Sequence, residues 1–219
     1  VKKLTSHINE LLDLSSEGLK TIPEISENKL TLKKQRSNVL GNSLGDSLRE
    51  FGLSKIQDKE LPPVKEVIGM FNSSSYRNDS NLDEGILSET DIREMAPIKN
   101  NVTIHRLTGQ EVQIFFEGLR RFREREEIYS PQMSANIRES DNYQLLIRNR
   151  RASWKPLKFD KEYYLVLDNW LAINGYHIPE HDKLALESKI VGSMDQYEVL
   201  SKYIHNALRE NFFREMSCH

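Results

Sequence analysis

The chain has 219 residues, 37% of them hydrophobic and 29% charged, and a formal net charge of -2. This length allows one large or two small domains, and the net charge excludes a uniform polycation, so nucleic-acid binding would need a local basic region. The single cysteine, Cys218, excludes a disulfide within the chain and favours a reducing compartment. No apolar run approaches the roughly 20 residues of a membrane-spanning helix, so no membrane partner is expected.

Residues 1–22 have apolar side chains at helical spacing, which predicts an amphipathic helix. A helix of this length is marginal alone in water, so it needs a surface to pack on, either in a partner protein or in the body of this chain. The candidate partner-binding residues are Leu4, Ile8, Leu11 and Leu12.

Two short helices are predicted next. The first lies within residues 43–56, has apolar side chains on one face and is expected to stop at Gly52. The second covers residues 64–71, after the Pro62-Pro63 pair. Residues 72–84 then read NSSSYRNDSNLDE, which has too few apolar groups to form a core and predicts a linker.

The stretch from 102 to 151 carries the clearest local signals. Thr108 followed by Glu111 is a capping box, and the apolar residues after it recur at helical spacing, which predicts a helix over about 108–123. Pro131 is compatible with the start of a short helix near 131–137, and Ser140 opens a third run to 151.

The third run ends in a basic segment, and no acidic residue occurs from Asn142 to Phe159. Its cations would contact phosphates, and Asn149 could reach a base edge. The candidate DNA-binding residues are Arg148, Asn149, Arg150, Arg151, Lys155 and Lys158. Trp154 either attaches a connecting segment to the core or stacks on a base. The alternative for the whole stretch is a helical hairpin with a solvated basic face.

Three short helices with a threonine cap, an aromatic near the end of the first helix and a basic third helix resemble a Myb/SANT repeat at about 105–151. Thr108, Phe122, Ile128 and Leu146 take the places of the family's cap and core residues, but the family's core tryptophans are absent. The resemblance implies binding of DNA through the third helix, or of chromatin or protein partners.

The rest of the chain predicts three more helices, at 159–176, 182–194 and 196–216, which would form an antiparallel bundle. His177 and His181 have the spacing of a helical metal site, but Pro179 between them argues against a helix there, so no metal is predicted. The expected fold is therefore all-α. Its expected segments are 1–71 for partner binding, 72–101 as a linker, 102–158 as the basic SANT/Myb-like unit and 159–219 as the C-terminal helices.

The sequence lacks a Gly-rich phosphate loop, a G-x-S-x-G motif, an H-E-x-x-H motif and a dinucleotide fingerprint. These absences, together with the basic unit, predict a non-enzymatic nuclear subunit of a transcription or chromatin assembly. Its expected partners are protein subunits and double-stranded DNA or histones, with no cofactor and no small-molecule substrate. The alternative is a helical scaffold or adaptor that binds only proteins, in the nucleus or the cytoplasm.

Overall fold

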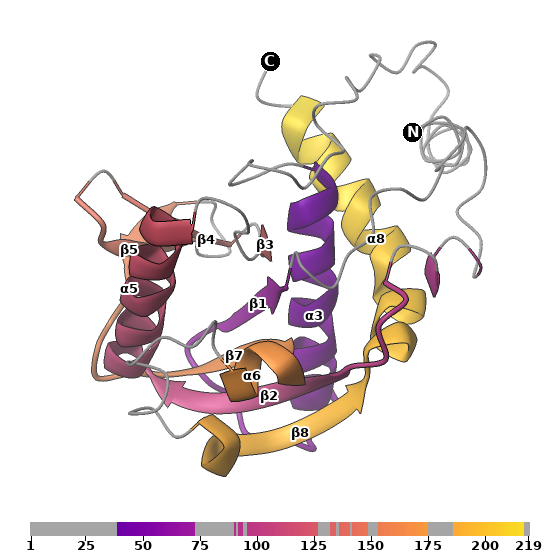
Figure 1. The fold of residues 1–219 in the computed structure, drawn as a ribbon, viewed down its shortest axis with the longest axis horizontal. Coiled ribbons are helices and arrows are strands. Elements are labelled where there is room, and N and C mark those ends of the chain that lie inside the picture. The colour runs from indigo at the N-terminus through magenta and orange to yellow at the C-terminus, as the bar shows by residue number, and fades with distance from the viewer. Residues whose placement is uncertain are drawn as a thin grey trace.

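The computed structural model describes residues 39–72, 90, 92–93, 96–126, 132–134, 136–140, 142–148, 153–174 and 186–216. They form an α/β fold with a five-stranded sheet in the order β3-β1-β7-β2-β8 and a three-stranded sheet in the order β4-β5-β6 (Figure 1). The prediction of an all-α fold was therefore wrong.

The described elements are as follows. The helices are α3 (Val39–Gln57), α5 (Gly109–Glu126), α6 (Asn169–Asn174) and α8 (Gln196–Met216), with a 3-10 turn η3 (Leu186–Lys189). The strands of the large sheet are β1 (Val67–Phe71), β2 (Asn101–Thr108), β3 (Gln132–Met133), β7 (Glu162–Asp168) and β8 (Ile190–Asp195). Those of the small sheet are β4 (Ile137–Glu139), β5 (Leu145–Arg148) and β6 (Trp154–Pro156). No helix in this part of the chain is long and apolar enough to cross a membrane.

The large sheet separates two hydrophobic cores. Helices α3 and α8 lie side by side and pack on one face, while α5, α6, η3 and the small sheet contribute to the core on the other (Figure 1). Within β7, Tyr164 and Val166 belong to the first core and Leu165 to the second. A strand buried on both faces reads as a continuous apolar run, which periodicity alone does not distinguish from a buried helix.

Helix α3 lies directly on β1, and Gly69 makes this possible. A Cβ at Gly69 would lie 1.9 Å from the carbonyl oxygen of Gly45 and 2.7 Å from the backbone nitrogen of Arg49. Any larger side chain would therefore separate the helix from the strand. The close approach also explains why Gly52 does not end the helix as predicted: α3 continues to Gln57, and Gly52 faces β1 and β7 from within it.

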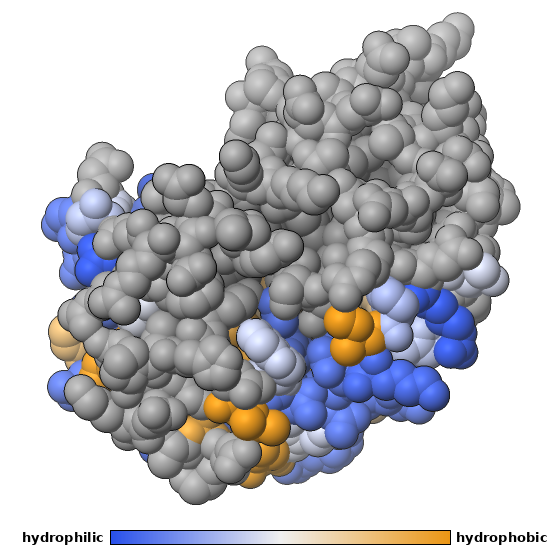
Figure 2. All heavy atoms as spheres, in the orientation of Figure 1, coloured by the Kyte–Doolittle hydropathy of each residue, from blue (hydrophilic) through white to orange (hydrophobic). Residues whose placement is uncertain are grey.

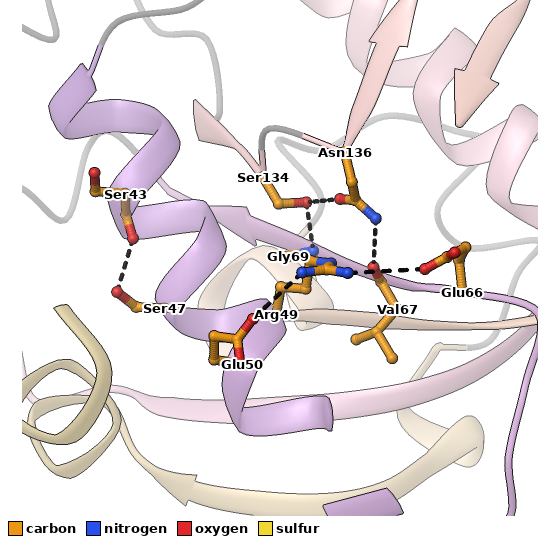
Figure 3. A network of polar contacts seen from close by, with 9 residues as sticks. All are labelled: Ser43, Ser47, Arg49, Glu50, Glu66, Val67, Gly69, Ser134 and Asn136. Carbon is orange, nitrogen blue, oxygen red and sulfur yellow. Dashed lines mark hydrogen bonds and ion pairs between the residues drawn. The ribbon is translucent and has the colours of Figure 1, made fainter. Parts of the chain in front are cut away.

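Strand β1 also forms a buried polar network with the residues that follow β3 (Figure 3). The Gly69 N–H donates to Ser134 Oγ over 3.0 Å, and the Ser134 N–H donates to the Gly69 carbonyl over 2.8 Å. The Ser134 hydroxyl donates to Asn136 Oδ1, and Asn136 Nδ2 donates to the Val67 carbonyl over 2.9 Å. These bonds extend the pairing of β1 past the two residues of β3, so few backbone groups of β1 are left unpaired.

Three predicted helices are confirmed, and the first of them is α3, which includes the predicted residues 43–56. Helix α5 matches the prediction for 108–123, and its capping box is present: the Thr108 N–H donates to Glu111 Oε2 over 2.8 Å, and the Glu111 N–H donates to Thr108 Oγ1 over 3.3 Å. Helix α8 has the predicted bounds of 196–216.

The other helices predicted after residue 63 were wrong. The predictions at 64–71, 131–137, 140–151, 159–176 and 182–194 correspond to β1, to β3 with the start of β4, to β5, to β7 with α6, and to η3 with β8. Strands β1 and β7 are short apolar runs that the large sheet buries, and β1, β7 and β8 pair with strands far away in sequence, which local periodicity does not reveal.

The predicted segments 1–71, 102–158 and 159–219 all contribute strands to the large sheet. The predicted partner-binding residues Leu4, Ile8, Leu11 and Leu12 lie outside the described residues, as does most of the predicted linker.

Candidate functional site

The most informative place in the fold is the edge of the large sheet where β1 and β7 end. These strands are parallel, with Met70 beside Leu167, so their carboxyl ends reach the same edge. In open α/β sheets, ligands bind in the crevice outside such carboxyl ends. Asn72 follows β1 here and is buried, and Asn169 follows β7. We call this place the carboxyl edge.

Asp168, the last residue of β7, is fully buried at the carboxyl edge. Its Oδ1 accepts a hydrogen bond from the Leu171 N–H over 2.9 Å and so caps helix α6, while Oδ2 has no hydrogen-bond partner. Burial raises the pKa of Asp168 to about 6, against the opposing effect of the backbone N–H groups of Leu171, Asn72 and Trp170. This carboxyl group therefore has unused capacity to accept a hydrogen bond, and its protonation changes near neutral pH.

Helix α6 begins at the carboxyl edge and presents large apolar groups to solvent. Trp170 is 37% exposed and Ile173 is 49% exposed. Figure 2 shows hydrophobic side chains on the surface over α6, beside the more hydrophilic surface of neighbouring elements. An exposed indole offers a flat apolar face on which a planar ligand can stack.

Strands β2 and β8 contribute further polar groups to the same edge. The Asn101 N–H at the start of β2 donates to Asn169 Oδ1 over 3.2 Å, and Asn101 pairs with Asp195 at the end of β8. Gln196 follows, with 2% of its surface exposed and no hydrogen-bond partner for either side-chain amide atom. Buried polar atoms without partners are costly, and they are frequent at functional sites.

Within the part of the chain that the structure describes, no group of three or more His, Cys, Asp or Glu residues could hold a metal ion. His177 and His181, which have metal-site spacing in the sequence, lie outside this part.

The predicted DNA-binding residues lie elsewhere in the fold. Arg148 ends β5, Lys155 lies in β6, and Lys158 lies between β6 and β7. Asn149, Arg150 and Arg151 are outside the described residues. The Arg148 N–H donates to the carbonyl of Asn136, whose side chain bonds to Val67 at the start of β1, so this region adjoins the end of β1 opposite the carboxyl edge.

Residues 19–180 match the family described as the 5'-nucleotidase C-terminal domain. The chain belongs to this family. No curated protein matches the sequence.

Several solved structures resemble this 5'-nucleotidase C-terminal domain, among them the following two. One is a 5'-nucleotidase precursor from Thermus thermophilus, with a TM-score of 0.54 and 17% identity over 83% of this chain and 34% of that chain. The other is the NAD nucleotidase of Haemophilus influenzae, with a TM-score of 0.53 and 16% identity over 82% of this chain and 31% of that chain. At these identities the likeness shows the fold, and this chain spans about a third of the length of each.

The family corrects the functional prediction. The Myb/SANT resemblance was wrong, because residues 145–148, in the middle of the helix expected to bind DNA, form the strand β5. The predicted non-enzymatic nuclear DNA-binding subunit without a small-molecule substrate is likewise contradicted, since the matching family is the 5'-nucleotidase C-terminal domain. The nuclear or cytoplasmic location stays a prediction.

Sequence reasoning missed Asp168 and Trp170 as site residues, because it assigned both to a helix over 159–176. A signal was present: the apolar run in Glu162–Asp168 ends in Asp-Asn, which is typical of a buried strand followed by a helix cap.

Proposed function

We propose that this chain is the nucleotide-binding domain of a 5'-nucleotidase-type enzyme, and that the nucleotide binds at the carboxyl edge with its base stacked on Trp170. The observation that carries the proposal is an exposed tryptophan beside the carboxyl ends of two parallel strands. A nucleobase presents a flat π-face and a polar rim, and it needs both an aromatic surface and hydrogen-bonding groups.

The carboxyl edge provides both kinds of group. Trp170 supplies the aromatic surface, and the polar residues at the ends of β1, β7 and β8 lie at the same edge of the sheet. Membership of the 5'-nucleotidase C-terminal domain family and the names of the structural neighbours support a nucleotide as the ligand.

The proposal assigns substrate binding to this domain and phosphate-ester hydrolysis to the enzyme as a whole. The solved nucleotidases are about three times as long as the region that this chain matches. A domain that binds the nucleoside part would position the phosphate for chemistry carried out by other parts of such an enzyme, and correct positioning lowers the barrier.

Tryptophan fluorescence tests the proposal directly, because the chain has only two tryptophans. In a Trp154→Phe protein, Trp170 is the only indole. We expect adenosine monophosphate to quench its emission in a saturable way. Ribose 5-phosphate, which has the sugar and phosphate but no base, should bind more weakly and leave the emission nearly unchanged.

Calorimetry on variants then measures the stacking contribution. Stacking on an aromatic side chain contributes roughly 1–3 kcal/mol, so Trp170→Ala should weaken binding of adenosine monophosphate by about 5- to 150-fold. Phe159→Ala is the matched control, since Phe159 is 54% exposed but precedes β7, at the opposite edge of the sheet. Equal affinities of all three proteins, or no binding by any of them, would contradict the proposal.

A further inference from the structure

The small sheet has one face with an unusual set of side chains. Cross-strand pairing places Arg138 opposite Leu146, Leu146 opposite Pro156, and Arg148 opposite Trp154. Because side chains alternate along a strand, these five residues share one face, and Ile137 and Ile147 lie on the other, in the hydrophobic core. Arg138 and Pro156 are exposed, so solvent reaches this face. We call it the arginine face.

Two guanidinium groups lie close to one indole ring on the arginine face. The Cζ of Arg138 lies 4.3 Å from the centre of the Trp154 ring, and that of Arg148 lies 6.0 Å from it. The two positive charges are therefore within about 10 Å of each other and repel. The stacking on Trp154 offsets part of this repulsion.

Among the described residues, no carboxylate balances these charges. Glu139 is the only acidic residue in the three strands, and strand alternation places it on the core side, away from Arg138. In this part of the chain, neither Arg138 nor Arg148 forms an ion pair. A pair of arginines without an acidic partner, held by an aromatic ring and the strand backbone, is arranged to receive an anion from outside.

The chemistry of the guanidinium group indicates which anion. It is planar and has five N–H donors in a fork that matches the oxygens of a phosphate, and contact between its flat face and an indole leaves the in-plane donors available. We propose that Arg138 and Arg148, positioned by Trp154, form a phosphate-binding site on the arginine face, separate from the carboxyl edge and independent of the nucleotide site proposed there.

The phosphate could belong to a free molecule or to a lipid headgroup, and one protein distinguishes these sources. In a Trp170→Phe protein, Trp154 is the only indole, so its emission reports on this face. The protein is titrated with inorganic phosphate. It is then titrated with vesicles of phosphatidylcholine alone and of phosphatidylcholine containing phosphatidic acid.

We expect a saturable change in Trp154 emission with phosphate. Arg138→Gln and Arg148→Gln should each weaken the response about 10-fold, as expected for the loss of charge-assisted hydrogen bonds. Arg148→Lys keeps the charge but loses the fork, so it should weaken binding by an intermediate factor. The matched control is Lys155→Gln, in the same sheet: Lys155 is exposed but pairs with Ile147, so alternation places it on the face opposite the arginines, and its loss should change affinity less than about 2-fold.

Each outcome decides the question. A response to phosphatidic acid vesicles alone, lost in Arg138→Gln, supports the site and identifies a headgroup as the source. An equal loss in Lys155→Gln and in the arginine variants would show only general surface charge and would overturn the proposal, as would no response to either probe. Because Arg138 is exposed, Arg138→Gln remains informative if Arg148→Gln does not fold.

Discussion

The two edges of the large sheet differ in whether their polar side chains have hydrogen-bond or ion-pair partners. At the edge where β2 ends and α5 begins, Glu111 accepts hydrogen bonds from Thr108 and pairs with Lys189 over 2.7 Å. At the carboxyl edge, Asp168 is buried with one oxygen unpartnered and Gln196 is buried with both amide atoms unpartnered. Saturated polar groups contribute to stability alone, whereas unsaturated ones keep a capacity for binding at a cost in stability.

The two carboxyl groups also respond to pH in opposite directions. Burial raises the pKa of Asp168 to about 6, so the folded state resists its ionisation. Burial alone would also raise the pKa of Glu111, but its hydrogen bonds with Lys189 and Thr108 outweigh this and lower it. With rising pH, Asp168 therefore reduces stability and Glu111 increases it.

The largest expected effect is at Gly69 in β1, where the backbone of α3 lies directly on the strand. Gly69→Ala should destabilise the protein by about 3 kcal/mol or more, since the new Cβ meets the backbone of α3. Urea unfolding followed by circular dichroism measures this. In Gly192→Ala, the new Cβ meets only the end of the Ile104 side chain at 3.2 Å, so a smaller cost is expected. Equal costs for the two variants would contradict the account of the α3 contact.

The next effect tests the carboxyl edge. Asp168→Asn removes the ionisation but keeps a side chain that caps helices well, so the variant should be more stable than the wild type by about 1–3 kcal/mol above pH 6. The sign follows from the raised pKa: the contribution of Asp168 is most favourable below its unfolded pKa near 3.8 and decreases as pH rises to about 6. Urea unfolding at about pH 4 and pH 7.5 checks this, and a difference that is independent of pH would rule out the titration of Asp168 as its cause.

The smallest effect is expected at the edge where β2 ends and α5 begins. Glu111→Gln keeps an oxygen for the capping box but loses the ion pair with Lys189, so it should cost less than about 1 kcal/mol at neutral pH. Because the pKa of Glu111 is lowered in the folded state, the difference should be fully present above its ordinary pKa of 4.5 and should be lost as the pH falls through the lowered folded-state pKa. The variant Lys189→Gln should show the same small cost and the same pH dependence, and a larger cost at low pH would contradict this assignment.

Whether an element could be predicted depended on how far apart its interacting residues are along the sequence. Helix α5 was predictable because Thr108 and Glu111 are three residues apart and form the cap whatever the rest of the chain does. Strand β7 was not predictable, because the elements that bury its apolar run are far away in the sequence. Helix α3 and strand β1 come long before it in the chain, and helix α8 comes after it. The exposed tryptophan of the candidate site was assigned to a helix core for the same reason.

The sequence by itself determined helices α5 and α8, through capping and apolar spacing over a few turns, and the concentration of basic residues around β5 and β6. Only the tertiary structure decided that the segments at 67–71 and 162–168 are parallel neighbours, a pairing across more than about 90 residues that no local pattern encodes. That pairing alone places Asn72, Asp168 and Trp170 at one edge, because parallel strands bring their carboxyl ends together.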